Sequence, residues 1–116
     1  MNIIQITLTT ILKRRDFLLA AAEKRSGQPG FLLQGRNRQD GNLNTRVGYT
    51  CSKKLGNAVA RNRAKRRLRE ISKGTLTQKG NPGWDYVLVG RPKTTLERNY
   101  SLLIEDLNKA IKKVHS

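Results

Sequence analysis

Residues 53–73 constrain this chain most strongly, because they carry nine of its twenty-four Lys and Arg residues and a single acid, Glu70. From about Asn57 onward, small or apolar residues recur three or four positions apart and so share one face of a helix. They are Ala60, Ala64, Leu68 and Ile71. Asn62, Lys65, Arg66 and Arg69 fall on the opposite face, and Arg61 lies at its border. The pattern predicts an amphipathic helix with a broad cationic face, ending near Lys73 and Gly74.

The charge of the whole chain points to a polyanionic partner. Its 116 residues suit one domain, and a hydrophobic content of 36% with 5% aromatic residues predicts a mostly aliphatic core. Twenty-four Lys and Arg against eight Asp and Glu give a formal net charge of +16. A charge of this size repels itself unless a polyanion is bound. Nucleic acid is the leading candidate partner, and an anionic membrane surface is the weaker one.

The remaining pattern predicts one mixed α/β domain over residues 9–116, preceded by an arm at 1–8. Asp16 is the expected N-cap of the first helix, and Thr94 with Glu97 form a capping box for the last one. Helices are expected at 17–25 and 94–114, strands at 31–34, 47–52 and 84–90, and a hairpin loop at 35–45. The unbroken apolar run in 84–90 predicts a strand that is buried on both faces.

Catalytic side chains are missing from the pattern. The single histidine, His115, stands next to the C-terminus, and no carboxylates are spaced for two-metal chemistry. The lone Cys51 excludes an internal disulfide and any cysteine-rich zinc site, which fits the cytoplasm. We therefore expect no catalytic residue and no metal site, and a protein that binds RNA or DNA without cutting it.

Two features leave alternatives open. Phe17, with Phe31 or Leu32, provides either a stacking surface for single-stranded bases or part of the core. Gly56, just before the basic helix, either allows a phosphate to approach the backbone or is an ordinary turn glycine. The sequence alone does not choose between these readings.

The basic segment resembles the signature of the bacterial ribonuclease P protein component. The motif residues are Lys53-Lys54, Gly56-Asn57-Ala58-Val59, Arg61-Asn62, Lys65-Arg66 and Arg69-Glu70. The resemblance extends to residues 12–17, 46–50 and 85–91, and so covers most of the chain. It implies a two-layer α/β sandwich like a ribosomal-protein domain, with the basic helix in a left-handed strand–helix–strand crossover. The residues alone would have predicted the right-handed connection.

The resemblance also implies a role. The protein would form a 1:1 complex, as a monomer, with a large catalytic RNA that uses Mg²⁺ to remove the 5′ leader of precursor tRNA. By this analogy the RNA is contacted by Lys53, Lys54, Arg61, Asn62, Lys65, Arg66 and Arg69. A cleft that holds the single-stranded leader would include Phe17, Ala21, Leu32 and Gln34. Because Ala21 and Gln34 stand where relatives carry aromatic residues, we expect this cleft to bind the leader backbone rather than to stack bases.

Three other classes remain as alternatives to this reading. A structural ribosomal RNA-binding protein fits the charge and the fold type, but the position of Arg61-Asn62-Arg63 within the basic motif does not indicate that class. A stand-alone nuclease would need the catalytic groups that the pattern lacks. A DNA-binding domain remains possible, but the sequence lacks a helix-turn-helix or zinc pattern. On the reading that the resemblance implies, neither DNA nor a membrane is an expected partner.

Overall fold

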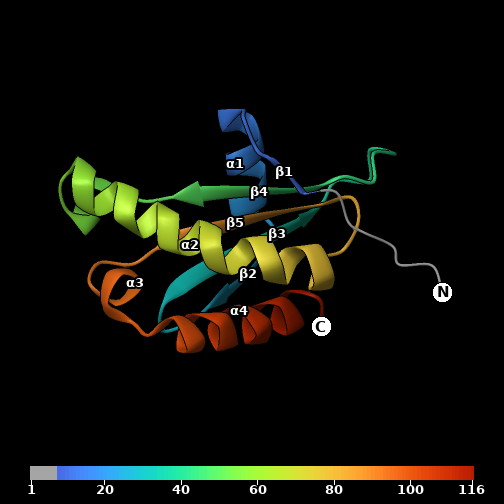
Figure 1. Cartoon of the computed structure of the whole chain (residues 1–116). Coiled ribbons are helices and arrows are strands. Elements are labelled where there is room, and N and C mark those ends of the chain that lie inside the picture. The colour runs from blue at the N-terminus through green and yellow to red at the C-terminus, as the bar shows by residue number, and fades with distance from the viewer. Residues whose placement is uncertain (1–7) are drawn as a thin grey trace.

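The computed structural model describes residues 8–116 (Figure 1). These residues form five strands and four α-helices, with one short 3₁₀ helix before the longest α-helix. In order they are β1 Leu8–Thr10, α1 Arg14–Ala21, β2 Lys24–Gly27, β3 Phe31–Asn37, β4 Thr45–Thr50, η1 Lys53–Leu55, α2 Ala58–Lys79, β5 Trp84–Gly90, α3 Thr94–Glu97 and α4 Tyr100–Val114. Residues 1–7, which make up most of the arm expected at 1–8, lie outside the described residues, and Leu8 begins β1.

The strands form one mixed sheet in the order β1-β4-β5-β3-β2. β4 runs parallel to both β1 and β5, whereas β3 runs antiparallel to β5 and β2. α2 and α4 pack against each other on one face of the sheet, and α1 packs on the other face, against β3 and β5 (Figure 1). This confirms the expected mixed sandwich and adds α1 as partial cover on the second face.

β5 is the central strand and is buried on both faces, as its apolar run predicts. Tyr86 and Leu88 point into the main core beneath α2 and α4, while Val87 joins Ile11 and Ala20 beneath α1. Alternate residues of one strand therefore hold the two helical layers in place.

The chain passes from β4 through α2 to its parallel neighbour β5. In Figure 1 α2 lies in front of the sheet, β4 points to the left, and β5 lies below it. When the view is turned so that β4 points upward, α2 still lies toward the viewer and β5 lies to the left of β4. The β4–α2–β5 connection is therefore left-handed. This is the uncommon hand that the family resemblance implies and that general chirality rules would not predict.

The first helix differs from its prediction at both ends. α1 begins at Arg14 rather than Phe17, Lys13 occupies the N-cap position, and no side chain caps the helix. Asp16 is not the cap. It lies in the first turn, where it is buried beside arginines of β3 and β4. Lys24 and Arg25, predicted to be helical, belong to β2, because their backbone pairs with β3.

The hairpin predicted at 35–45 is wrong. β3 continues to Asn37, and β5 lies between β3 and β4, so these consecutive strands do not pair. The connecting loop instead crosses the start of β5, where the N–H of Arg38 donates to the carbonyl of Gly83 at 3.2 Å. Sequence proximity suggested a hairpin, but the buried central strand, formed by residues far along the chain, inserts between the two.

The last two helices also differ from their predictions. α2 runs past Gly74 to Lys79, because Leu76 continues the buried face. An exposed glycine costs a helix only about 1 kcal/mol, which this packing offsets. The predicted helix over 94–114 is divided, since the chain is extended at Arg98, and Asn99 caps α4 by accepting the N–H of Ser101. The predicted Thr94–Glu97 capping box therefore does not start a continuous helix.

The C-terminus packs on the sheet through His115. Its Nε2 lies 2.6 Å from the hydroxyl of Tyr86, its Nδ1 lies 3.1 Å from the Asn81 amide nitrogen, and its ring lies edge-on to Trp84 at 4.2 Å between centroids. Burial, with Lys24 adding a smaller effect, holds the pKa of His115 below its ordinary 6.5.

This depressed pKa predicts a stability that depends on pH. The unfolded chain binds a proton on this imidazole more readily than the folded chain, so stability is complete above the unfolded pKa and falls as the pH drops below about 6.5. Denaturant unfolding at pH 7.5 and pH 5 should show a smaller acid-induced loss for His115→Gln than for the parent chain. An equal loss in both chains would show that His115 does not contribute.

Candidate nucleic-acid interface

The start of α2 is fixed by the residues just before it. The Asn57 side chain caps the helix by accepting the N–H of Ala60 at 2.9 Å. Gly56 has φ 131°, a conformation that disfavours side chains, and a Cβ there would lie 3.1 Å from the Cβ of Ala60. Buried Leu55 anchors η1, which leaves Lys53 and Lys54 exposed beside the N-terminus of α2. A turn requirement is therefore sufficient to explain Gly56.

The predicted division of α2 into two faces is confirmed. Ala64, Leu68 and Ile71 are buried against the sheet, while Ala60 is only half-buried. The predicted binding residues lie on the other side: Lys53, Lys54, Asn62, Arg66 and Arg69 are exposed, and Arg61 and Lys65 are half-buried. Within residues 8–116 none of these cations forms an ion pair. We call these seven residues the α2 face.

Arg61 differs from its exposed neighbours. Its Nε is buried and has no hydrogen-bond partner in the part of the chain that the structure describes. A buried donor without an acceptor is costly, so this atom favours an arrangement in which an outside acceptor is bound.

Arg67 belongs to the same basic run but has a structural place. Its guanidinium donates to the carbonyls of Thr95, at 2.9 Å, and of Arg98, and it lies over the ring of Tyr100 at 4.2 Å. It therefore ties α2 to the α3–α4 connection. Helical spacing separates Arg67 from Arg66, because Arg67 stands three residues after Ala64 and so falls on the apolar side of the helix. Its partners lie about thirty residues away and have no local sequence signal.

A cleft of about 650 Å³ lies between α1 and the sheet and reaches Lys65 of α2. Of the predicted cleft residues, Phe17, Ala21 and Gln34 line it, whereas Leu32 does not. The residues that sequence reasoning missed are Leu12, Arg14, Leu18, Tyr49, Thr50, Cys51 and Val89. Helical spacing would have indicated Arg14 and Leu18, which share a face of α1 with Phe17. Strand alternation would have indicated Tyr49 and Val89, but it does not specify which face of the sheet α1 covers.

Phe17 is half-buried, and its position resolves the two readings left open for it. Its ring packs on the backbone of β4 at Gly48, beside Ile11 and Val87 of the smaller core, and it also lines the cleft. The same ring therefore closes the core and forms one wall of the cleft. Phe31, by contrast, is fully buried in the main core.

Cys51 is a buried thiol at the edge of the cleft. Burial raises the pKa of the Cys51 thiol, and nearby Lys65 only partly opposes this. A thiol held in its neutral form is a poor nucleophile.

Within 8–116, no three His, Cys, Asp or Glu side chains are grouped so that they could hold an ion. Over the same residues, no helix has the length and apolar character needed to cross a membrane.

The fold and the site define a class of small basic α+β protein in which a left-handed β–α–β unit presents a cationic helix face beside a cleft, and within residues 8–116 that face forms no ion pair. A sequence model of the family described as Ribonuclease P matches residues 8–115. The chain therefore belongs to the Ribonuclease P protein family.

Individual relatives agree with this assignment. A ribonuclease P protein component from Ruegeria pomeroyi is 51% identical over 110 residues, covering 94% of this chain and 88% of that protein. One from Paramagnetospirillum magneticum is 48% identical over 111 residues, covering 92% and 83%. Among solved structures, the RNase P protein of Staphylococcus aureus has a TM-score of 0.72 at 26% identity, covering 92% and 97% of the two chains. The RNase P protein of Thermotoga maritima has a TM-score of 0.69 at 31% identity, covering 86% and 92%.

Proposed function

We propose that this chain is the protein subunit of a ribonucleoprotein endonuclease, and that it binds the catalytic RNA through the α2 face. The single observation that carries the proposal is that none of the six cations of this face pairs with a carboxylate within residues 8–116. Solvated helix faces normally alternate charge sign, whereas RNA phosphates are matched by Lys and by the forked donors of Arg. The unpartnered Nε of Arg61 supports the same role.

We further propose that the cleft beside α1 holds the single-stranded 5′ leader of precursor tRNA. The cleft contains Phe17 as one aromatic wall, Arg14 at its rim and Lys65 where it meets the α2 face. Ala21 and Gln34 supply no ring, so the aromatic side chains of the lining are Phe17 and Tyr49, while Arg14 and Lys65 offer charged donors to a leader backbone. Such a cleft would accept leaders of many sequences.

The chemistry in this proposal belongs to the RNA partner. The RNA would hold Mg²⁺ and cleave the phosphodiester bond to leave the mature 5′ end, in a 1:1 complex located in the cytoplasm. The protein would position the two RNAs and offset their mutual repulsion with its net charge of +16. No side chain of this chain is assigned a catalytic role.

The proposal is tested by sequencing the RNA that co-purifies with the native protein. We expect one dominant, structured RNA that cleaves precursor tRNA on its own at high Mg²⁺. Recovery of ribosomal RNA in stoichiometric amounts, retained after a high-salt wash, would instead support a structural ribosomal protein.

The contact between Phe17 and Gly48 makes the cleft testable. A Cβ on residue 48 would lie 2.5 Å from Cε1 and 2.7 Å from Cζ of the Phe17 ring. In Gly48→Ala the ring must move, at a cost to stability of about 1–3 kcal/mol. We expect weaker binding of precursor tRNA by the holoenzyme, with little change in binding of mature tRNA. Gly74→Ala is the matched control, since a Cβ there meets nothing within 4 Å. Equal loss for mature and precursor tRNA would contradict a leader cleft.

A further inference from the structure

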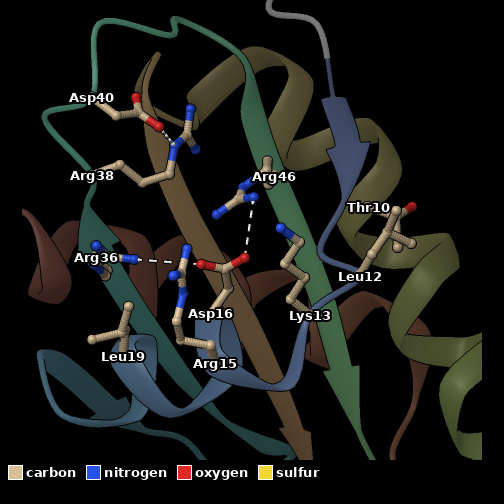
Figure 2. A pocket seen from close by; sticks show the side chains of 10 residues that line it. All are labelled: Thr10, Leu12, Lys13, Arg15, Asp16, Leu19, Arg36, Arg38, Asp40 and Arg46. Atoms are coloured by element: carbon tan, nitrogen blue, oxygen red, sulfur yellow. Dashed lines mark hydrogen bonds and ion pairs between the residues drawn. The ribbon is translucent and has the colours of Figure 1, made fainter.

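A second pocket, of about 330 Å³, opens on the other side of α1 and is rich in cations (Figure 2). α1, β3, β4 and the loop between β3 and β4 supply most of its walls. Its lining residues are Thr10, Leu12, Lys13, Arg15, Asp16, Leu19, Arg36, Arg38, Asp40 and Arg46. Only Leu12 also lines the cleft described above. The two hollows are therefore separate sites that meet at one residue.

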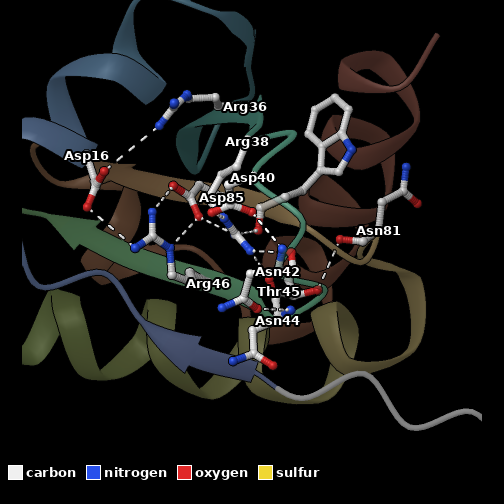
Figure 3. Close-up of polar contacts among 11 residues, drawn as sticks. Asp16, Arg36, Arg38, Asp40, Asn42, Asn44, Thr45, Arg46, Asn81 and Asp85 are labelled. Carbon is white, nitrogen blue, oxygen red and sulfur yellow. Dashed lines mark hydrogen bonds and ion pairs between the residues drawn. The ribbon is translucent and has the colours of Figure 1, made fainter.

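The floor of this pocket is a closed ion network around Asp85 (Figure 3). Arg46 donates hydrogen bonds to both carboxylate oxygens of Asp85, at 2.7 and 2.6 Å, and Arg38 donates to one of them at 2.7 Å. The Asp85 side chain has no exposed surface, and the Arg38 side chain is only 4% exposed. Arg38 also donates to the carbonyls of Trp84, Asn42 and Asn44, so its hydrogen-bonding capacity is used inside the protein.

Asp16 forms a second, looser layer above this floor. Its two oxygens lie 3.4 Å from Arg46 and 3.9 Å from Arg36. The longer distance exceeds a hydrogen bond, so the Arg36 guanidinium is oriented by Asp16 without being satisfied by it. The Arg36 side chain is 20% exposed, and in Figure 2 it points toward Asp16 from the β3 side of the pocket.

Lys13 and Arg15 complete the rim and are exposed. No ion pair within residues 8–116 involves either of them. The pocket and its floor thus bring together five cations (Lys13, Arg15, Arg36, Arg38 and Arg46) with three carboxylates (Asp16, Asp40 and Asp85). Two positive charges are left over, and they belong to the groups at the mouth.

We propose that this pocket binds a phosphodiester group of RNA, held by Arg15, Arg36 and Lys13. Forked guanidinium donors match phosphate oxygens, and the buried carboxylates fix the arginines before the ligand arrives. Leu12 and Leu19 at the rim offer apolar contact for a sugar or base. The inference rests on the proposed function for its polymer, and it adds an RNA contact outside both the α2 face and the leader cleft. The phosphate belongs either to the catalytic RNA or to a leader that continues past Leu12.

A titration with inorganic phosphate tests whether the pocket recognises the group. In ¹⁵N–¹H spectra of the full chain, the Nε–H signals of Arg15 and Arg36 should shift saturably, and Arg25, exposed on β2, should not. Titration with chloride at equal ionic strength controls for screening. Shifts of equal size at all three arginines, or no shift at Arg15 and Arg36, would overturn the proposal.

The double variant Lys13→Gln/Arg15→Gln distinguishes the source of the phosphate in the assembled holoenzyme. Lys109→Gln/Lys112→Gln, on the exposed side of α4, removes the same net charge and is the matched control. A salt slope for catalytic RNA binding that is shallower by about 0.7–0.9 than in the control, the value for one phosphate released, assigns the phosphate to the catalytic RNA. Several-fold weaker binding that appears only with precursors of longer leader assigns it to the leader. If the rim double variant and its control gave the same result in both assays, the proposal that this pocket binds a phosphate would be overturned.

Arg66→Ala, measured in parallel, separates this failure from failure of the proposed function. If Arg66→Ala weakens binding of the catalytic RNA while the rim double variant matches its control, only the pocket proposal fails. If Arg66→Ala has no effect either, the proposed function itself fails.

Discussion

Replacing Asp85 with Asn is expected to lower the free energy of unfolding by about 3–5 kcal/mol, the range for breaking a buried ion pair from one side. Asp85 is fully buried and holds Arg38 and Arg46 by three hydrogen bonds of 2.6–2.7 Å. The hydrogen bonds with Asp85 raise the pKa of Arg46 above its ordinary value. A guanidinium group stays charged in proteins even without such a partner. Two guanidinium groups would then be packed together, and the buried counter-charge left to them would be Asp16, at the longer distance of 3.4 Å from Arg46. Urea unfolding followed by circular dichroism measures the loss.

Asp40→Asn is the matched control for this substitution. Asp40 also contacts Arg38, at 3.1 Å, but its side chain is half exposed, and exposed pairs contribute little. We expect its midpoint of unfolding to stay close to that of the parent chain. If Asp85→Asn and Asp40→Asn were equally mild, the buried network would not be a main support of the β4–β5 pair.

Arg61→Ala and Arg66→Ala are each expected to weaken binding of the catalytic RNA about tenfold, the scale of one charged hydrogen bond. Arg66 is exposed on the α2 face, and the Nε of Arg61 is buried without an acceptor. Each loss should also make the dependence of log affinity on log salt shallower by about 0.7–0.9 for each phosphate released. Filter binding over a series of salt concentrations measures both quantities.

Arg25→Ala and Arg67→Ala are two controls for this loss of RNA affinity. Arg25 is exposed on β2, away from the α2 face, and its loss removes the same charge. Arg67 supports the α3–α4 connection, so Arg67→Ala should lower the midpoint of unfolding more than it changes the salt slope. If Arg25→Ala weakened binding as much as Arg61→Ala and Arg66→Ala, total charge rather than the α2 face would determine affinity.

Elements with a strong local period were predictable from the sequence. The two faces of α2 and the double burial of β5 follow from residue spacing, which the folded chain preserves. The short edge strands β1 and β2 were missed, because Lys24 and Arg25 carry no strand signal and are extended only through pairing with β3. The division of the last helix depends on Arg98, which pairs with Asp106 at 2.7 Å, a contact that no local pattern encodes.

The candidate site shows the same division between local and distant information. Helical geometry identified the cations of the α2 face and left Arg67 outside it, whereas the partners of Arg67, the carbonyls of Thr95 and Arg98, have no local sequence signal. The second pocket could not have been predicted, because Asp16, Arg36 and Arg46 come from α1, β3 and β4. The sheet order, with β5 inserted between β3 and β4, brings them together.

Reconstitution at low Mg²⁺ tests whether this chain enables an RNA partner to process precursor tRNA. The catalytic RNA is assayed alone, with the parent protein, and with Arg61→Ala/Arg66→Ala, while cleavage at the mature 5′ end is followed over time. We expect efficient cleavage only with the parent protein, little with the double variant, and none with the protein lacking RNA. Equal cleavage by the RNA with and without the protein would contradict the account.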